Sequence, residues 1–235
     1  MFFAISDRLG PAHLADTNIE LAVTYTVVRD SPEKLIERLD AHAAEHAKSP
    51  RDYFESVRAL NAGEEQCGPV MRDPVAVAAR FVYLNRCCYN GLYRVNKSGR
   101  FNAPWNKQDQ FKFCAETIRA AAGALSNTKV TAQDFRKASP NSGDFVYCDP
   151  PYDKTYNQYS ADRFDDDEQR ALAKLVRTWA EAGVRVMVSN SDTAFVRGLY
   201  SMGFHIHEVA APRPLNRDGE ARGPVSDLVL TSYEI

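Results

Sequence analysis

From residue 129 to the carboxyl end, short apolar runs alternate with segments in which apolar residues recur at helical spacing. The expected strands are Lys129–Ala132, Asp144–Cys148, Val184–Val188, Phe204–Val209 and Val225–Ser232. The expected helices are Asp166–Ala182 and Thr193–Met202. Because strands that alternate with helices usually form a parallel sheet covered by those helices, the pattern predicts an α/β fold with a mostly parallel sheet.

The beginning of the chain adds a strand and two clear helix starts. A short strand is expected around His13–Ala15, followed by a helix from residue 18 to 28 with Ile19 and Val23 on one stripe. Ser31-Pro32 and Asp73-Pro74 each place a capping residue before a proline, which is typical of the first turn of a helix. We therefore expect helices to begin at both prolines.

The segment between Tyr89 and Trp105 has a different character. Its aromatic and β-branched residues are interrupted by Asn90-Gly91 and Ser98-Gly99, a pattern that favours loops and a β-hairpin. A further helix is expected near Phe111–Leu125. The sheet is thus assigned to residues 1–29 and 126–235, and residues 30–125 are assigned to an inserted helical and hairpin region.

Composition excludes several classes of protein. No apolar run approaches the length that crosses a bilayer, and the first residues lack the features of a secretory signal, so a cytoplasmic location is expected. The five cysteines are an odd number without a CxxC pair, which favours reduced thiols. His205 and His207 stand at alternate positions of an expected strand, which is more often one face of a sheet than a metal site. No metal is expected.

The charge of the chain is unevenly distributed. Its net charge is -2, yet residues 80–112 hold seven basic residues and one acid, Asp109. The basic residues are Arg80, Arg86, Arg94, Lys97, Arg100, Lys107 and Lys112. Such a local cluster is compatible either with nucleic-acid binding or with a solvated basic face.

The sharpest motif is Asp149-Pro150-Pro151-Tyr152, which ends the apolar run Phe145–Cys148. Ligands of open α/β sheets bind at the carboxyl ends of strands, although a strand terminated by prolines with a turn aspartate would look the same. A carboxylate and a proline carbonyl held rigidly in sequence can accept both hydrogens of an amino group on a base, which frees the nitrogen lone pair for reaction. The tyrosine ring offers a stacking face for a base flipped out of a duplex.

Several further blocks accompany this motif in the chain. They are Leu14–Asn18, Phe81–Arg86, Tyr89–Asn96, Gly99–Pro104, Val146–Tyr152 and Val186–Thr193. Together these blocks resemble the Dam-like DNA adenine methylases, the D12 class or alpha group. The resemblance implies a Rossmann-like fold and transfer of a methyl group from S-adenosylmethionine to the exocyclic N6 of adenine in double-stranded DNA. It also implies that residues 30–125 recognise the target.

The resemblance assigns roles to individual residues. The implied catalytic residues are Asp149, Pro150 and Tyr152. The implied cofactor-binding residues are Asp16, Asp134, Phe135 and Asp149. For the Asp134-Phe135 pair, a plain strand exit with a core aromatic is the alternative.

Other implied roles concern DNA and the target base. Arg94 matches the base-reading arginine of the recognition hairpin, and Tyr89 and Asn90 match residues near the flipped base. Phosphate contacts are implied for Lys97, Arg100 and Lys107. Ser189-Asn190 is expected to line the adenine pocket. The hairpin suggests a GATC-type site as a first guess.

The chain departs from this family at the cofactor site. Members of the family begin with a strand and a Phe-x-Gly-x-Gly turn that wraps the methionine part of the cofactor, and this sequence has no such turn. We therefore expect the first, central strand of the sheet to be missing and cofactor binding by this chain alone to be weak or absent. A truncated sequence or misassigned start explains this best, and a partner chain that supplies the strand or a degenerate homologue are the alternatives. A silent DNA-binding protein and a methyltransferase for RNA or protein are the other functional classes.

Overall fold

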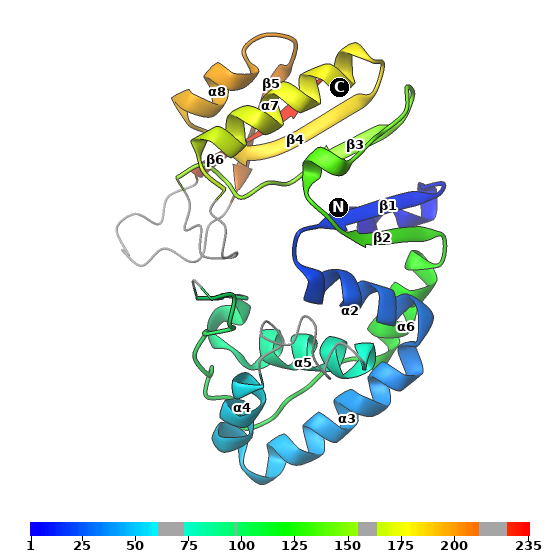
Figure 1. Cartoon of the computed structure of the whole chain (residues 1–235), viewed down its shortest axis with the longest axis vertical. Coiled ribbons are helices and arrows are strands. Elements are labelled where there is room, and N and C mark those ends of the chain that lie inside the picture. Colours follow the sequence, from blue (N-terminus) through cyan, green and yellow to red (C-terminus); the bar gives the residue numbers. More distant parts are fainter. Residues whose placement is uncertain (61–72, 97, 155–163, 212–224) are drawn as a thin grey trace. The chain divides into compact units, whose positions relative to one another are not determined.

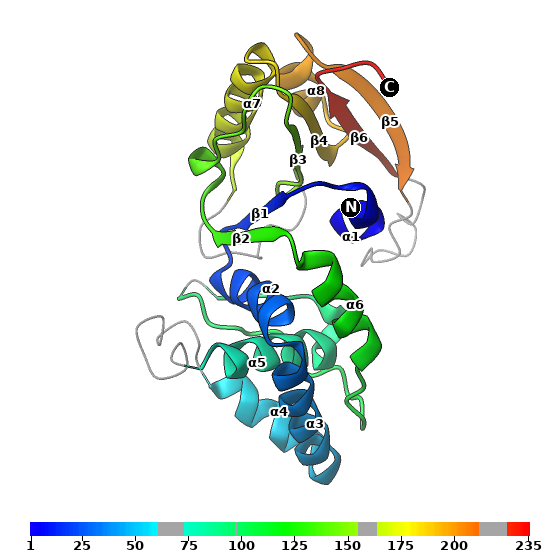
Figure 2. The same ribbon diagram turned by 90° about the vertical axis from the view of Figure 1, so that its right-hand side faces the viewer.

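The computed structural model describes residues 1–60, 73–96, 98–154, 164–211 and 225–235. The described residues form two compact units, one within residues 1–135 and one within residues 136–235. Figure 1 and Figure 2 show the elements of each unit. None of the described helices is both long enough and apolar enough to cross a membrane.

The first unit contains a parallel pair of strands, β1 (Ala12–Asp16) and β2 (Thr128–Ala132). The register pairs Ala12 with Thr128 and Asp16 with Ala132, so both strands end at the same edge. Short elements α1 (Phe2–Ile5) and η1 (Ser6–Arg8) precede β1. Both strands were predicted from the sequence within one residue of their observed bounds.

Helices fill the long connection between these two strands (Figure 1). They are α2 (Ile19–Asp30), α3 (Pro32–Lys48), α4 (Pro50–Ala59), α5 (Pro74–Cys87) and α6 (Ala115–Leu125). The helix starts at Pro32 and Pro74 are confirmed. The Asp73 carboxylate accepts the backbone N–H groups of Val75 and Ala76, whereas the Ser31 hydroxyl makes no capping bond.

The start of α6 was predicted about one turn too early. The helix begins at Ala115: residues 111–114 are not helical, and Cys114 at the N-cap is extended, with φ -118° and ψ 111°. Phe111 is buried in the helical core even though it is not helical. An apolar residue that packs from an extended segment gives the same spacing as the first turn of a helix.

The core of the first unit is built around Tyr83 and the apolar faces of α3, α4 and α5. Leu35, Leu39 and Phe54 are fully buried there. A charged group is also buried in this unit: Arg80 of α5 bonds Glu20 of α2 at 2.9 Å, and the side chains are 6% and 13% exposed. The Tyr93 hydroxyl donates to the other Glu20 oxygen at 2.8 Å, so this carboxylate ties α2, α5 and the segment after α5 together.

The predicted hairpin follows a 3-10 turn, η3 (Tyr89–Gly91). Val95 and Phe101 form an antiparallel bridge, and the N–H of residue 96 donates to the carbonyl of Arg100 at 2.8 Å. The chain turns at Ser98-Gly99, and Gly99 has a φ of 76°, a conformation that favours glycine. The hairpin prediction is therefore confirmed, while Lys97 lies outside the described residues.

The second unit contains a four-stranded sheet in the order β3-β4-β6-β5. Its strands are β3 (Phe145–Cys148), β4 (Arg185–Ser191), β5 (His205–Ala211) and β6 (Val225–Thr231). β3 and β4 are parallel, but β6 is antiparallel to both β4 and β5. The prediction of a mostly parallel sheet was thus wrong for β6: the sequence places no predicted helix before the last strand, and strands without a crossover helix pair antiparallel.

Two helices cover this sheet (Figure 2). Helix α7 (Asp166–Glu181) contacts β4 through an apolar stripe that includes Leu172, Val176 and Trp179. Helix α8 (Ala194–Tyr200) contacts β5, and the hydroxyl of its N-cap residue, Thr193, accepts the N–H of Val196. Both helices were predicted from the sequence within two residues at either end.

The buried ion pair gives a prediction about stability. Arg80→Met removes the cation and leaves the mostly buried Glu20 carboxylate without a compensating charge, so we expect the free energy of unfolding to fall by about 3–5 kcal/mol. Urea denaturation followed by far-UV circular dichroism measures this loss. The matched control is Arg119→Met, which breaks the exposed Arg119–Glu33 pair and should leave stability unchanged. Equal losses in the two variants would contradict the prediction.

Candidate active site and DNA-binding surface

The Asp149–Tyr152 motif follows directly after β3, at the carboxyl end of a parallel strand pair. The register aligns Cys148 with Val188, which brings the next residue of each strand, Asp149 and Ser189, side by side. The Ser189 hydroxyl donates to Oδ1 of Asp149 at 2.7 Å, and the Tyr147 hydroxyl lies 3.0 Å from the same serine oxygen. One oxygen of the carboxylate is therefore fixed by the protein, which orients the other.

The backbone of this loop is held by side chains from α7 and β4. The Gln169 amide donates to the carbonyl of Pro151 at 2.8 Å, and Asn190 Oδ1 accepts the N–H of Asp153 at 2.9 Å. Thr193, the capping residue of α8, donates to the Asp153 carboxylate at 2.6 Å. The segment after the two prolines is thus tied to three different elements.

Sequence reasoning did not find Gln169, Asp153 or Thr193, and it assigned Asn190 to the base pocket rather than to this support. Gln169 carried a usable signal, because it is a polar residue at a core position of the amphipathic helix α7 and is 2% exposed. A buried amide needs hydrogen-bond partners, so such a position indicates a nearby polar site.

Tyr152 of the motif and Tyr147 of β3 are neutral phenols. Burial raises the pKa of Tyr152, and the negative charge of Asp149 raises it further. The same two causes act on Tyr147, in the same order. Both rings can stack or donate a hydrogen bond, but neither phenol is suited to act as a base near neutral pH.

The predicted cofactor residues of the first unit meet at the carboxyl ends of β1 and β2. Asp16 ends β1, and Asp134 and Phe135 follow β2 after one residue, Gln133. The N–H of Gln133 donates to the Asp16 carbonyl at 2.9 Å, which holds the two strand ends together. One Asp16 carboxylate oxygen accepts the N–H of Asn18 at 2.7 Å. A carboxylate and a half-buried aromatic ring at one strand edge suit the ribose hydroxyls and the purine of a nucleoside.

Arg94 lies in the first strand of the hairpin and is partly buried. Its Nε donates to Oδ1 of Asn102 at 2.8 Å, and Nη2 donates to the Asn102 carbonyl at 2.8 Å. The guanidinium is therefore held flat against the opposite strand. To bond the edge of a base, Arg94 must either use its remaining N–H groups or replace its bonds to Asn102 with bonds to the base. Asn102 was not predicted, because only the folded hairpin brings it to Arg94.

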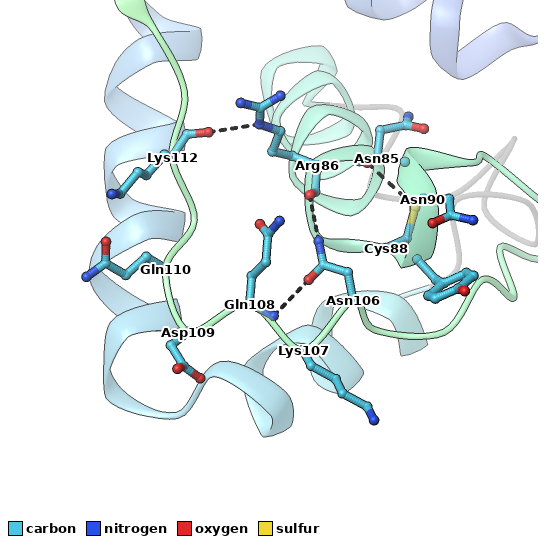
Figure 3. A pocket seen from close by; sticks show the side chains of 12 residues that line it. Asn85, Arg86, Cys88, Asn90, Asn106, Lys107, Gln108, Asp109, Gln110 and Lys112 are labelled. Atoms are coloured by element: carbon cyan, nitrogen blue, oxygen red, sulfur yellow. Dashed lines mark hydrogen bonds between the residues drawn. The ribbon is translucent and has the colours of Figure 1, made fainter. Parts of the chain in front are cut away.

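Tyr89, Asn90 and Lys107 line an open hollow of about 1050 Å³ (Figure 3). Tyr89 is 59% exposed, and Asn90 and Lys107 have positive φ angles of 57° and 65°, which turn the chain sharply at both places. In Figure 3 the side chain of Gln108 extends into the hollow. Arg100 is exposed on the hairpin itself.

The walls of the hollow are fixed by an asparagine and an arginine (Figure 3). The Asn106 side chain donates to the carbonyl of Arg86 at 3.1 Å and accepts the N–H of Gln108 at 3.0 Å. Arg86 Nε donates to the carbonyl of Lys112 at 3.2 Å. The surface thus combines amide groups with cations, a composition that suits both phosphates and base edges.

Among the described residues, no group of three or more histidine, cysteine or acidic side chains is arranged to hold a metal ion. His207 and His205 lie on β5, at an edge of the described sheet, and His207 Nε2 is 3.2 Å from the Thr231 hydroxyl oxygen. The His207 side chain is therefore part of a contact between β5 and β6.

Residues 1–214 match the D12 class N6 adenine-specific DNA methyltransferase family. The chain belongs to this family. It is 33% identical to the Type II methyltransferase M.MjaIII of Methanocaldococcus jannaschii, over 94% of this chain and 79% of that protein. It is 32% identical to the Type II methyltransferase M1.LlaDCHI of Lactococcus lactis subsp. cremoris, over 99% and 82%. A DNA adenine methylase of Vibrio cholerae serotype O1 is 29% identical over 92% and 78%.

Cys148, directly before the Asp149–Tyr152 motif, gives a prediction about thiol reactivity. Burial and the neighbouring Asp149 raise the pKa of the Cys148 thiol to about 12. At pH 8 its thiolate fraction should be about a thousandfold below that of an ordinary thiol, so iodoacetamide should label Cys148 far more slowly than the exposed Cys114. Peptide mass spectrometry measures both rates. Labelling in urea is the control, where the two rates should converge, and equal rates in the folded chain would refute the prediction.

Proposed function

We propose that this chain is a site-specific DNA methyltransferase that moves a methyl group from S-adenosylmethionine to N6 of a flipped adenine in double-stranded DNA. The observation that carries the proposal is the oriented Asp149 carboxylate at the end of β3, followed by Pro150 and held by Ser189 at 2.7 Å. Family membership supports it over a methyltransferase for RNA or protein.

The adenine amino group is a poor nucleophile because its lone pair is delocalised into the ring. The Asp149 carboxylate and the Pro150 carbonyl accept hydrogen bonds from its two N–H groups, so the nitrogen can become tetrahedral and direct its lone pair at the methyl carbon. The two prolines and the bonds to the loop fix these acceptors before the base arrives, which lowers the cost of reorganisation. The neutral ring of Tyr152 stacks on the base and holds it out of the duplex.

The cofactor supplies an activated methyl group on a sulfonium, so no metal is required for the transfer. Asp16 would accept hydrogen bonds from its ribose hydroxyls, and Asp134 and Phe135 would hold its adenine, Phe135 by stacking. The acid and the aromatic side chain at the ends of β1 and β2 fit these groups. Asp149 would also face the cofactor in this assignment.

We further propose a Rossmann-like sheet whose first strand is missing from these residues. The parallel pairing of β1 with β2 in the first unit and of β3 with β4 in the second supports this proposal, because a doubly wound sheet is built from parallel strands. A Gly-rich segment, from an upstream part of the chain or from a partner, would supply it. In this assignment residues 1–29 and 126–235 form the catalytic domain and residues 30–125 recognise the target.

The recognition roles follow from the exposed groups of the first unit. Arg94 would read the edge of a guanine, and Tyr89 and Asn90 would fill the gap left by the flipped base. Phosphate contacts are assigned to Arg100 and Lys107, and to Lys97 outside the described residues. These contacts set the register of the protein on DNA without reading its sequence.

The central test incubates the chain with unmethylated duplex DNA and methyl-labelled S-adenosylmethionine and quantifies N6-methyladenine by mass spectrometry. We expect Asp149→Ala to lower the rate by about 100-fold or more, because it removes one of the two acceptors for the amino group. Asp166→Ala, which removes an exposed carboxylate from the first turn of α7, is the control and should keep the parent rate.

Two other outcomes are informative. Product that forms only after a family Gly-rich segment is added upstream would show that the cofactor half needs that strand. DNA binding without product in either form would support the silent DNA-binding protein instead.

Base reading is tested separately. Arg94→Ala should relax the preference for one base pair by about 1–3 kcal/mol, because the bidentate contact to the base edge is lost. Competition between duplexes that differ at single positions of a GATC-type site measures this preference. Lys107→Ala is the control: it should weaken binding to all duplexes alike and reduce the salt dependence. An unchanged base preference in Arg94→Ala would contradict the assignment.

A further inference from the structure

Both peptide groups that flank Tyr152 are held by side chains. The carbonyl of Pro151, which precedes Tyr152, accepts a bond from Gln169 Nε2 at 2.8 Å. The N–H of Asp153, which follows Tyr152, donates to Asn190 Oδ1 at 2.9 Å. The backbone of the proposed stacking residue is therefore fixed on both sides.

The two clamping side chains also bond each other. Asn190 Nδ2 donates to Gln169 Oε1 at 3.0 Å, and the two residues are 0% and 2% exposed. The direction of each amide is determined, because a carbonyl can only accept and a backbone N–H can only donate. The N–H of Ser191 is a second donor to Asn190 Oδ1, at 2.8 Å. The pair forms a continuous bridge from α7 through β4 to the loop.

We propose that Gln169 and Asn190 are positioning residues that set the backbone of Tyr152, and through it the stacking face for the target base. This inference rests on the proposed function for the role of Tyr152. The hydrogen bonds of Gln169 and Asn190 to each other and to the loop, which we call the clamp, are present in the chain without DNA or cofactor. A buried network whose members are all bonded resists distortion, because each broken bond leaves an unpaired polar group away from water. The backbone on both sides of Tyr152 is therefore set before a base arrives.

The clamp depends on a donor at position 169, not only on a side chain of the right size. Gln169→Glu keeps the shape but turns an acceptor toward the Pro151 carbonyl, so the ionised side chain should repel the loop. A protonated carboxyl can donate again, and a buried carboxyl near carbonyl oxygens holds its proton to higher pH than usual. The variant should therefore regain the clamp as the pH falls.

Hydrogen–deuterium exchange of the free chain tests the clamp without DNA or cofactor. In Gln169→Glu at pH 8, and in Gln169→Met at any pH, we expect the protection factor of the peptide that covers Asp149–Lys154 to drop about tenfold while that of β6 stays unchanged. Lowering the pH should restore protection in Gln169→Glu but not in Gln169→Met. The control is Lys174→Gln, which changes the charge of an exposed residue of α7 by the same amount.

Unchanged protection in both Gln169 variants would overturn the proposal. Loss of protection throughout the second unit would overturn it as well, because the pair would then support the whole fold rather than the loop. The location of the lost protection separates these two cases, and the pH-dependent recovery shows that a donor is required at position 169.

The link to the base is measured with a GATC duplex that carries 2-aminopurine in place of the target adenine. We expect the fluorescence change on binding to fall at least several-fold in Gln169→Glu at pH 8 and to recover at lower pH, at equal DNA occupancy. No fluorescence change with the bound parent chain would count against the proposed function, and the exchange experiment would still decide the clamp. A full change in both Gln169 variants would refute the positioning role.

Discussion

The parallel pairing of β3 with β4 determines where the chemistry of the second unit can lie. Parallel strands end at the same edge, and the register puts Asp149 beside Ser189 with 2.7 Å between their oxygens. A shift of one residue would turn both side chains to opposite faces and remove this bond. The orientation of the carboxylate, the path of the two prolines and the support from Asn190 all depend on this register.

Much of this arrangement could be predicted from the sequence, because it depends on local signals. The apolar run that ends at Asp149-Pro150 predicts a strand, and the Ser-Pro and Asp-Pro pairs at Pro32 and Pro74 predict helix starts. The structure confirms both helix starts. The direction of β6 was missed, since strand direction depends on which neighbours a strand finds. The bonds from Gln169 to the loop were missed for the same reason.

The first unit shows the same division between local and distant information. Aromatic, basic and glycine residues predict the hairpin, whereas the bonds between Arg94 and Asn102 require the register of its two strands. Glu20 looks in the sequence like an ordinary acid in the first turn of a helix. Only the fold shows that Arg80 and Tyr93 converge on it and join the helical core to the base of the hairpin.

The position of β6 has a consequence for how the second unit is made. β6 follows β5 in the chain but lies between β4 and β5 in the sheet, and it pairs with both. During synthesis β4 and β5 emerge first and cannot pair with each other in the final order. The nascent unit therefore leaves ladder edges open until its last strand inserts, a non-local step of the kind that slows folding and invites aggregation.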